Sequence, residues 1–120
     1  MAHKYSPILL DHFMNPRNIG AMEDYTLQVT GENPRDGDYV RFFLKVEEDT
    51  VKDVSFQVKG CPRFIAASSF TSEKIKNHTI SEILSMDPVE IQETLEIEEE
   101  VFACVSLPLK TIQKALLGTR

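Results

Sequence analysis

The stretch VSFQVKGCPRFIAASS, residues 54–69, changes from the periodicity of a strand to that of a helix. Before Gly60, apolar and polar residues alternate, which is typical of a half-buried strand, and the glycine permits a sharp turn. From Cys61 onward, apolar residues recur three and four positions apart, and Pro62 suits the first helical position because no N–H is needed there. Cys61 is therefore predicted at the positive end of a helix dipole, which favours the metal-binding thiolate.

Size, composition and charge limit the kinds of protein this can be. The chain has 120 residues, enough for one domain, predicted over residues 1–120. Its hydrophobic content of 42% and charged content of 27% are those of a globular protein. A net charge of −6 argues against a nucleic-acid partner, since no basic surplus is available to displace counterions.

The sequence also bears on the cellular compartment. No apolar run approaches the ~20 residues that a membrane helix needs, so we expect no membrane span. The first residues lack the apolar core of a signal peptide, and we therefore expect a cytoplasmic location. In a reducing compartment, the two cysteines are predicted to be thiols or metal ligands rather than a structural disulfide.

The order of the predicted elements favours an α+β fold. A capping serine and a proline, Ser6 and Pro7, begin a short helix that ends at Asn15. Three strands joined by polar turns follow, predicted over residues 25–30, 39–46 and 51–59. Such a meander needs cover on one face, and the later amphipathic helices are predicted to supply it.

Four helices are predicted in the second half of the chain, over residues 61–77, 79–84 and 87–95 and from Cys104 or Val105 to Gly118. The last of them has Pro108 in its first turn, where proline is tolerated. An acidic segment, residues 96–100, is interpreted as a solvated link between helices.

Three residues are candidate metal ligands because each lies at the end of a predicted element. Cys61 and Cys104 both precede helices that should pack on the same sheet, and Asp36 lies in a glycine-containing turn before a strand. If these ends meet, two thiolates and a carboxylate would suit zinc or an iron–sulfur cluster, with Asp38, water or a partner's side chain as a further ligand. The alternative is that the cysteines are small hydrophobic residues and the Asp-Gly pair is an ordinary turn.

The other polar residues with chemical potential are given simpler roles. His12 is predicted on the polar side of the first helix, as a surface or capping residue. Ser68, Ser69 and Ser72 are interpreted as small residues that let a helix approach the sheet closely.

Several motifs resemble those of the IscU/NifU-type iron–sulfur cluster scaffold proteins. They are DHFMNPRNIG at residues 11–20, KGC at 59–61 and IAASS at 65–69, together with the order helix, three strands, helices. The resemblance extends from about Tyr5 to Leu117. It implies the fold of that family and a cluster, or zinc in its place, held by three cysteines with a histidine beside the last.

The chain departs from the family's pattern at the implied ligands. The family's Pro-x-Cys-Gly-Asp turn is here PRDGD, residues 34–38, which puts Asp36 at the first ligand position and Asp38 at the family's aspartate. Cys61 and Cys104 match the second and third cysteines, and Ala103 replaces the histidine. The family's chaperone-recognition segment, Leu-Pro-Pro-Val-Lys, is represented only by IEEEV at residues 97–101.

The resemblance implies a scaffold or carrier that binds a [2Fe–2S] cluster or iron through Asp36, Cys61 and Cys104, with zinc as a substitute. It further implies a cysteine desulfurase as sulfur donor, acceptor apo-proteins and no catalysis by the chain itself, with Hsp70-type chaperone transfer weakened or absent. Two alternatives stay open: a paralogue that has lost cluster assembly and acts as an interaction protein, and a zinc-binding or thiol-redox protein.

Overall fold

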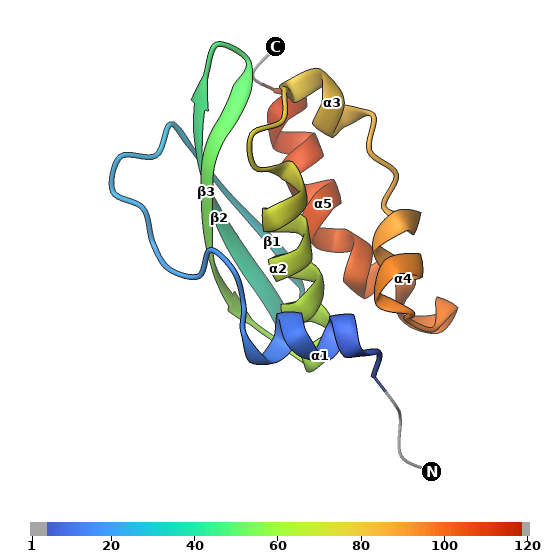
Figure 1. Ribbon diagram of the computed structural model, residues 1–120. Coiled ribbons are helices and arrows are strands. Elements are labelled where there is room, and N and C mark those ends of the chain that lie inside the picture. Colours follow the sequence, from blue (N-terminus) through green and yellow to red (C-terminus); the bar gives the residue numbers. More distant parts are fainter. Residues whose placement is uncertain (1–4, 119–120) are drawn as a thin grey trace.

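Three antiparallel strands form one sheet, in the order β1–β2–β3, in the computed structural model, which describes residues 5–118 (Figure 1). The strands are β1 (Leu27–Asn33), β2 (Asp38–Glu47) and β3 (Thr50–Lys59). The turn between β2 and β3 places Glu48 and Asp49 at φ values of 51° and 63°, the conformation of a type I′ hairpin. The predicted meander is confirmed.

Helices α2 and α5 cover the same face of this sheet, with α2 against β3 and α5 against β1 (Figure 1). The helices are α1 (Pro7–Met14), α2 (Pro62–Ile75), α3 (Ile80–Leu84), α4 (Val89–Leu95) and α5 (Phe102–Leu117), with a 3₁₀ turn, η1 (Glu99–Val101), before the last. This arrangement confirms the predicted α+β class. No helix among residues 5–118 has the length and hydropathy to cross a membrane.

The core lies between the sheet and these two helices. Alternate residues of β2 (Val40, Phe42 and Leu44) are fully buried, and Phe42 packs beside Phe56 of β3 with ring centroids 5.7 Å apart. Each large apolar side chain buried here stabilises the fold by about 1.5–3 kcal/mol. Because α2 and α5 pack on this core, it fixes where their first turns lie relative to the ends of the strands.

The first strand begins and ends later than the sequence predicts, at Leu27 and Asn33 rather than at residues 25 and 30. The predicted strand ends at residue 30 and a turn is expected next, but Gly31 pairs with Val40 inside the sheet. A Cβ at this position would collide with the side chain of Thr111 on α5. The glycine is therefore needed for close packing of a helix on the strand.

The last helix also differs from its prediction. It begins at Phe102, so Pro108 lies in the helix interior, buried, instead of in the first turn. Proline cannot donate to the carbonyl of Cys104 four residues earlier, but burial in the core offsets the loss. The solvated link predicted over residues 96–100 is wrong for Ile97, which is only 6% exposed. Glu98 is exposed, as predicted, and forms an ion pair with Arg63.

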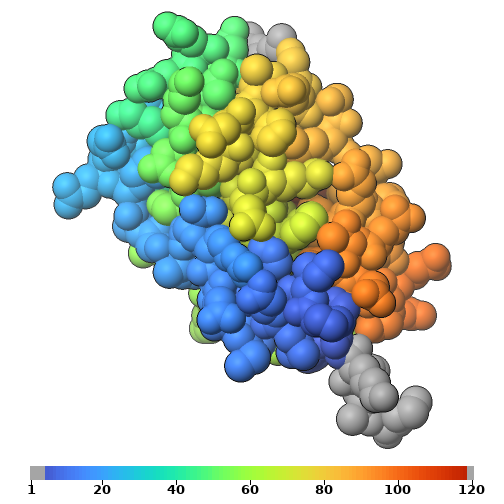
Figure 2. All heavy atoms as spheres, viewed as in Figure 1, coloured from blue at the N-terminus to red at the C-terminus, as the bar shows by residue number. Residues whose placement is uncertain are grey.

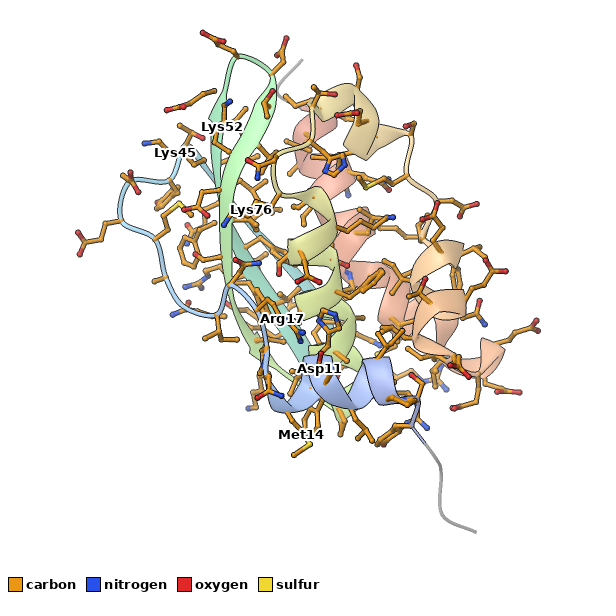
Figure 3. All side chains as sticks on the ribbon, viewed as in Figure 1. Asp11, Met14, Arg17, Lys45, Lys52 and Lys76 are labelled. Atoms are coloured by element: carbon orange, nitrogen blue, oxygen red, sulfur yellow. The ribbon has the colours of Figure 1, made fainter. Side chains whose placement is uncertain are left out.

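The prediction of a surface position for His12 is wrong, because this side chain is 4% exposed. Its Nδ1 lies 2.8 Å from Ser69 Oγ on α2, and the same oxygen accepts the backbone N–H of Arg17. Asn18 donates to Ser72 Oγ, and Arg17 pairs with Asp11 (Figure 3). The serines thus fasten the 11–18 segment to α2, and the two lie side by side at the surface (Figure 2).

Burial of His12 makes stability depend on pH. Burial foremost, and then the charge of Arg17, lower the pKa of His12 below its ordinary value of about 6.5. The unfolded chain therefore takes up a proton at a higher pH than the folded one, and stability is lost as the pH falls through 6.5. We expect the urea midpoint of the wild-type protein to fall between about pH 7.5 and pH 5.5, above the range where carboxylates titrate. In His12→Gln the fall should be smaller, and an equal fall would contradict the assignment to His12.

Candidate metal centre

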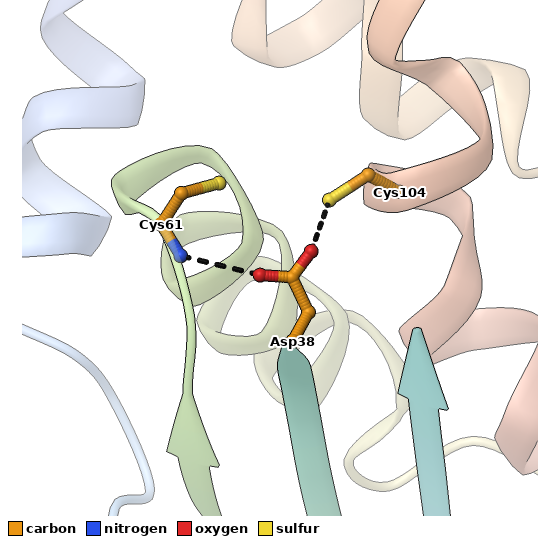
Figure 4. Close-up of side chains that lie close together, drawn as sticks. All are labelled: Asp38, Cys61 and Cys104. Atoms are coloured by element: carbon orange, nitrogen blue, oxygen red, sulfur yellow. Dashed lines mark hydrogen bonds between the residues drawn. The ribbon is translucent and has the colours of Figure 1, made fainter. Parts of the chain in front are cut away.

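Asp38 brings together the two cysteines of the chain. It begins β2 and is only 2% exposed. Its Oδ1 accepts the backbone N–H of Cys61 at 3.3 Å, and its Oδ2 accepts the thiol of Cys104 at 3.0 Å (Figure 4). One ligand atom from each of the three residues lies within 4.8 Å of the other two.

Local structure explains how each sulfur reaches this point. Cys61 is the N-cap of α2, directly after the turn at Gly60 that ends β3. A Cβ on Gly60 would contact the Asp38 carboxylate and the ring of Phe64, so the turn has no room for a side chain. Cys104 lies in the first turn of α5. The predicted convergence of Cys61 and Cys104 is therefore present.

The two thiols have different environments. Cys61 is exposed, whereas Cys104 is 8% exposed. Burial raises the pKa of Cys104 well above its ordinary value, and the hydrogen bond and charge of Asp38 raise that pKa further. Without metal, Cys104 is therefore protonated at neutral pH and donates to Asp38. A metal ion bound at Cys104 Sγ would displace this proton, so metal affinity should rise with pH.

Asp36, the carboxylate predicted as the first ligand, lies beside the centre. It lines a cavity of about 310 Å³ together with Asp38, Cys61 and Cys104. Its own carboxylate accepts a hydrogen bond from Asn33 Nδ2 at 3.0 Å, and it is not one of the three converging groups. Asp38, predicted only as a further ligand, instead lies between the two cysteines. Ligation by Asp36 stays a prediction.

Arg63 also lines this cavity, although it is not among the predicted site residues. It lies in the first turn of α2, where the dipole favours acidic rather than basic residues, and this mismatch was the available clue in the sequence. In the structure its guanidinium pairs with Glu98 and stacks on Tyr5.

Two sulfurs and a carboxylate oxygen form a donor set suited to a tetrahedral zinc or iron site. Thiolates favour zinc and iron–sulfur clusters, and the harder carboxylate is an accepted ligand for zinc. Three protein donors leave a position for a fourth ligand. The lining of the cavity contains no further sulfur or imidazole. Ala103 stands at the position where the family resemblance implies a histidine, and it lines a neighbouring cavity.

Comparisons with known proteins agree with this fold. The family model "NifU-like N terminal domain" matches residues 4–118. The "Iron-sulfur cluster assembly scaffold protein IscU" of Aquifex aeolicus is 36% identical over 119 residues, covering 97% of this chain and 76% of that protein. The "Zinc-dependent sulfurtransferase SufU" of Bacillus subtilis is 35% identical over 85 residues, covering 71% of this chain and 57% of that protein.

A solved structure matches as well. It comes from Fervidobacterium islandicum AW-1 and is described as a candidate iron–sulfur cluster assembly scaffold for the SUF system. The TM-score is 0.80 at 23% identity, covering 93% of this chain and 96% of the other. At that identity, the match supports the fold alone.

Proposed function

Because this chain belongs to the NifU-like N-terminal domain family, we propose that it is a scaffold or carrier for iron–sulfur cluster assembly. The cluster, or a metal ion in its place, is the cargo. The observation that carries the proposal is the meeting of Asp38, Cys61 and Cys104 within 4.8 Å. Relatives that are named cluster assembly scaffolds, such as the IscU of Aquifex aeolicus, support it.

We propose that Cys61 and Cys104 supply both sulfur ligands and that Asp38 and Asp36 supply oxygen ligands. Asp38 already lies between the two sulfurs, and Asp36 lines the same cavity. A site with two thiolates and two carboxylates is harder than one with three cysteines, which favours a labile cluster or single iron and zinc ions. Lability suits a carrier that must pass its cargo on.

The family resemblance extends the proposal to partners. A cysteine desulfurase would supply sulfur, and apo-proteins would receive the cluster. Cys61 is exposed and therefore accessible to either kind of partner. Residues 97–101 have no proline and three glutamates, so we expect the Hsp70-type chaperone route to contribute little.

The proposal is tested by metal analysis. Iron, zinc and acid-labile sulfide are measured on protein purified without oxygen, before and after reconstitution with iron and a sulfide source. We expect iron and sulfide in equal amounts, with visible charge-transfer absorption from thiolate-bound iron. The absence of both metal and sulfide after reconstitution would contradict the proposal.

A second candidate function is zinc-dependent sulfur transfer. The observation that favours it is the match to a relative named a zinc-dependent sulfurtransferase, together with a donor set that zinc accepts. On this proposal the same residues would bind zinc, and the chain would carry sulfur without building a cluster. The metal analysis distinguishes the two, since stoichiometric zinc without sulfide after reconstitution would favour this second candidate.

A further inference from the structure

We propose that Arg63 and Glu98 form a clamp that holds the segments carrying Cys61 and Cys104 at the spacing a shared metal ion or cluster needs. Arg63 is then a positioning residue that acts through the two thiols. The inference rests on the proposed function for its purpose, although the clamp itself is a property of the metal-free protein.

The ion pair spans the two thiol-bearing segments. Arg63 Nη2 lies 3.0 Å from Glu98 Oε2, with the side chains 14% and 40% exposed. Arg63 follows Cys61 by two residues in the first turn of α2, and Glu98 immediately precedes η1, which leads into α5 and Cys104. The pair therefore joins the two segments beside the cavity that their sulfurs share.

The surroundings hold the guanidinium in place. Its carbon lies 5.0 Å from the centre of the Tyr5 ring, a cation–π arrangement. The next residue, Ser6, donates its hydroxyl to the carbonyl of Leu95 at 2.7 Å, which fixes this part of the chain against the end of α4. Arg63 Nε is buried without a hydrogen-bond partner among the described residues, so Glu98 and Tyr5 make the directional contacts that keep Arg63 in position.

A second ion pair provides a matched control. Lys74 Nζ lies 2.7 Å from Glu90 Oε2 and joins the far end of α2 to α4. Their side chains are 24% and 55% exposed, so this pair is also partly buried. Neither residue lines the thiol cavity. Loss of the Lys74 pair should therefore affect stability without changing the spacing of the sulfurs.

The first measurement is a cobalt(II) titration, followed by the thiolate-to-cobalt charge-transfer band, on wild type, Arg63→Gln, Glu98→Gln and Lys74→Gln. We expect each clamp variant to bind cobalt about tenfold more weakly, the effect seen when residues that orient metal ligands are removed. The Lys74 variant should keep wild-type affinity. Arg63→Lys keeps the charge and should restore part of the affinity.

The second measurement needs no metal. Diamide oxidises Cys61 and Cys104 to a disulfide, and its N=N bond takes up the two electrons and two protons that the thiols lose. We expect this reaction to be several-fold slower in Arg63→Gln than in wild type, because the released segments spend less time with the sulfurs in contact. Urea midpoints measured in parallel report stability.

The outcomes separate the clamp from the proposed function. If wild type binds no cobalt and Arg63→Gln still slows disulfide formation, the clamp stands and metal binding is wrong. If wild type binds cobalt and Arg63→Gln matches it in affinity and disulfide rate, the clamp is overturned. The clamp would also be overturned if Arg63→Gln and Lys74→Gln lost cobalt affinity and disulfide rate only in proportion to the fall in their urea midpoints. The role of Arg63 would then be only structural.

Discussion

Replacement of either cysteine by alanine should remove most of the bound iron or zinc and leave the fold intact. Each substitution deletes one of two sulfur ligands, and the one sulfur and the oxygens that remain bind iron and zinc more weakly than the full set. We expect at least a tenfold loss of metal affinity for Cys61→Ala and for Cys104→Ala, because substitutions of residues that only support metal ligands already cost about 10–100-fold. Metal content after reconstitution and dialysis measures it.

The fold should survive because neither side chain is a large part of the core. Cys61 is exposed, and Cys104→Ala removes one small buried atom at a cost of about 1 kcal/mol. Met14→Ala is a suitable control, since it deletes another sulfur at a side chain that is 71% exposed on α1 (Figure 3). Full metal content in both cysteine variants would rule out the site.

Local sequence patterns predicted the elements that depend on local chemistry. The capping serine of α1 accepts the N–H of Leu9, and Thr79 and Glu82 form a reciprocal capping box at α3. The alternation of residues 54–58 and the turn at Gly60 place Cys61 where the structure has it. These features depend on neighbours in the chain, so residue spacing is enough to predict them.

Features that depend on distant residues were missed. His12 is buried where its ring meets Ser69, and glycine is needed at position 31 because Thr111 approaches the strand closely. The sequence gives no sign that Glu98 differs from the neighbouring glutamates, because its partner, Arg63, lies 35 residues earlier on α2. Periodicity along the chain contains no information about such pairs, and the same limit explains why Asp38 could not be ranked above Asp36.

The second large effect expected is on metal binding when Asp38 or Asp36 is replaced. Asp38→Ala should weaken iron or zinc binding at least tenfold, because it removes the group that lies between both sulfurs. Asp36→Ala should weaken it less, since the Asp36 carboxylate bonds to Asn33 and would have to turn toward the metal. Asp36→Cys should tighten binding by adding a third sulfur to the cavity. A larger loss in Asp36→Ala than in Asp38→Ala would make Asp36 the principal oxygen ligand.

The Asp38→Ala substitution should also make the thiol of Cys104 more reactive. The Asp38 carboxylate raises the pKa of Cys104 through its hydrogen bond and its charge, so Asp38→Ala should lower that pKa while the contribution of burial persists. At a fixed pH near 8, more thiolate forms, and iodoacetamide should alkylate Cys104 several-fold faster. Cys61, which is already exposed, provides an internal control measured in the same digest by mass spectrometry. Weaker metal binding with selectively faster alkylation of Cys104 is the result expected from loss of the carboxylate. Because opening of the fold would also expose the buried Cys104, the urea midpoint of Asp38→Ala is measured in parallel. Faster alkylation that is matched by a large fall in this midpoint would contradict the assignment to the lost carboxylate.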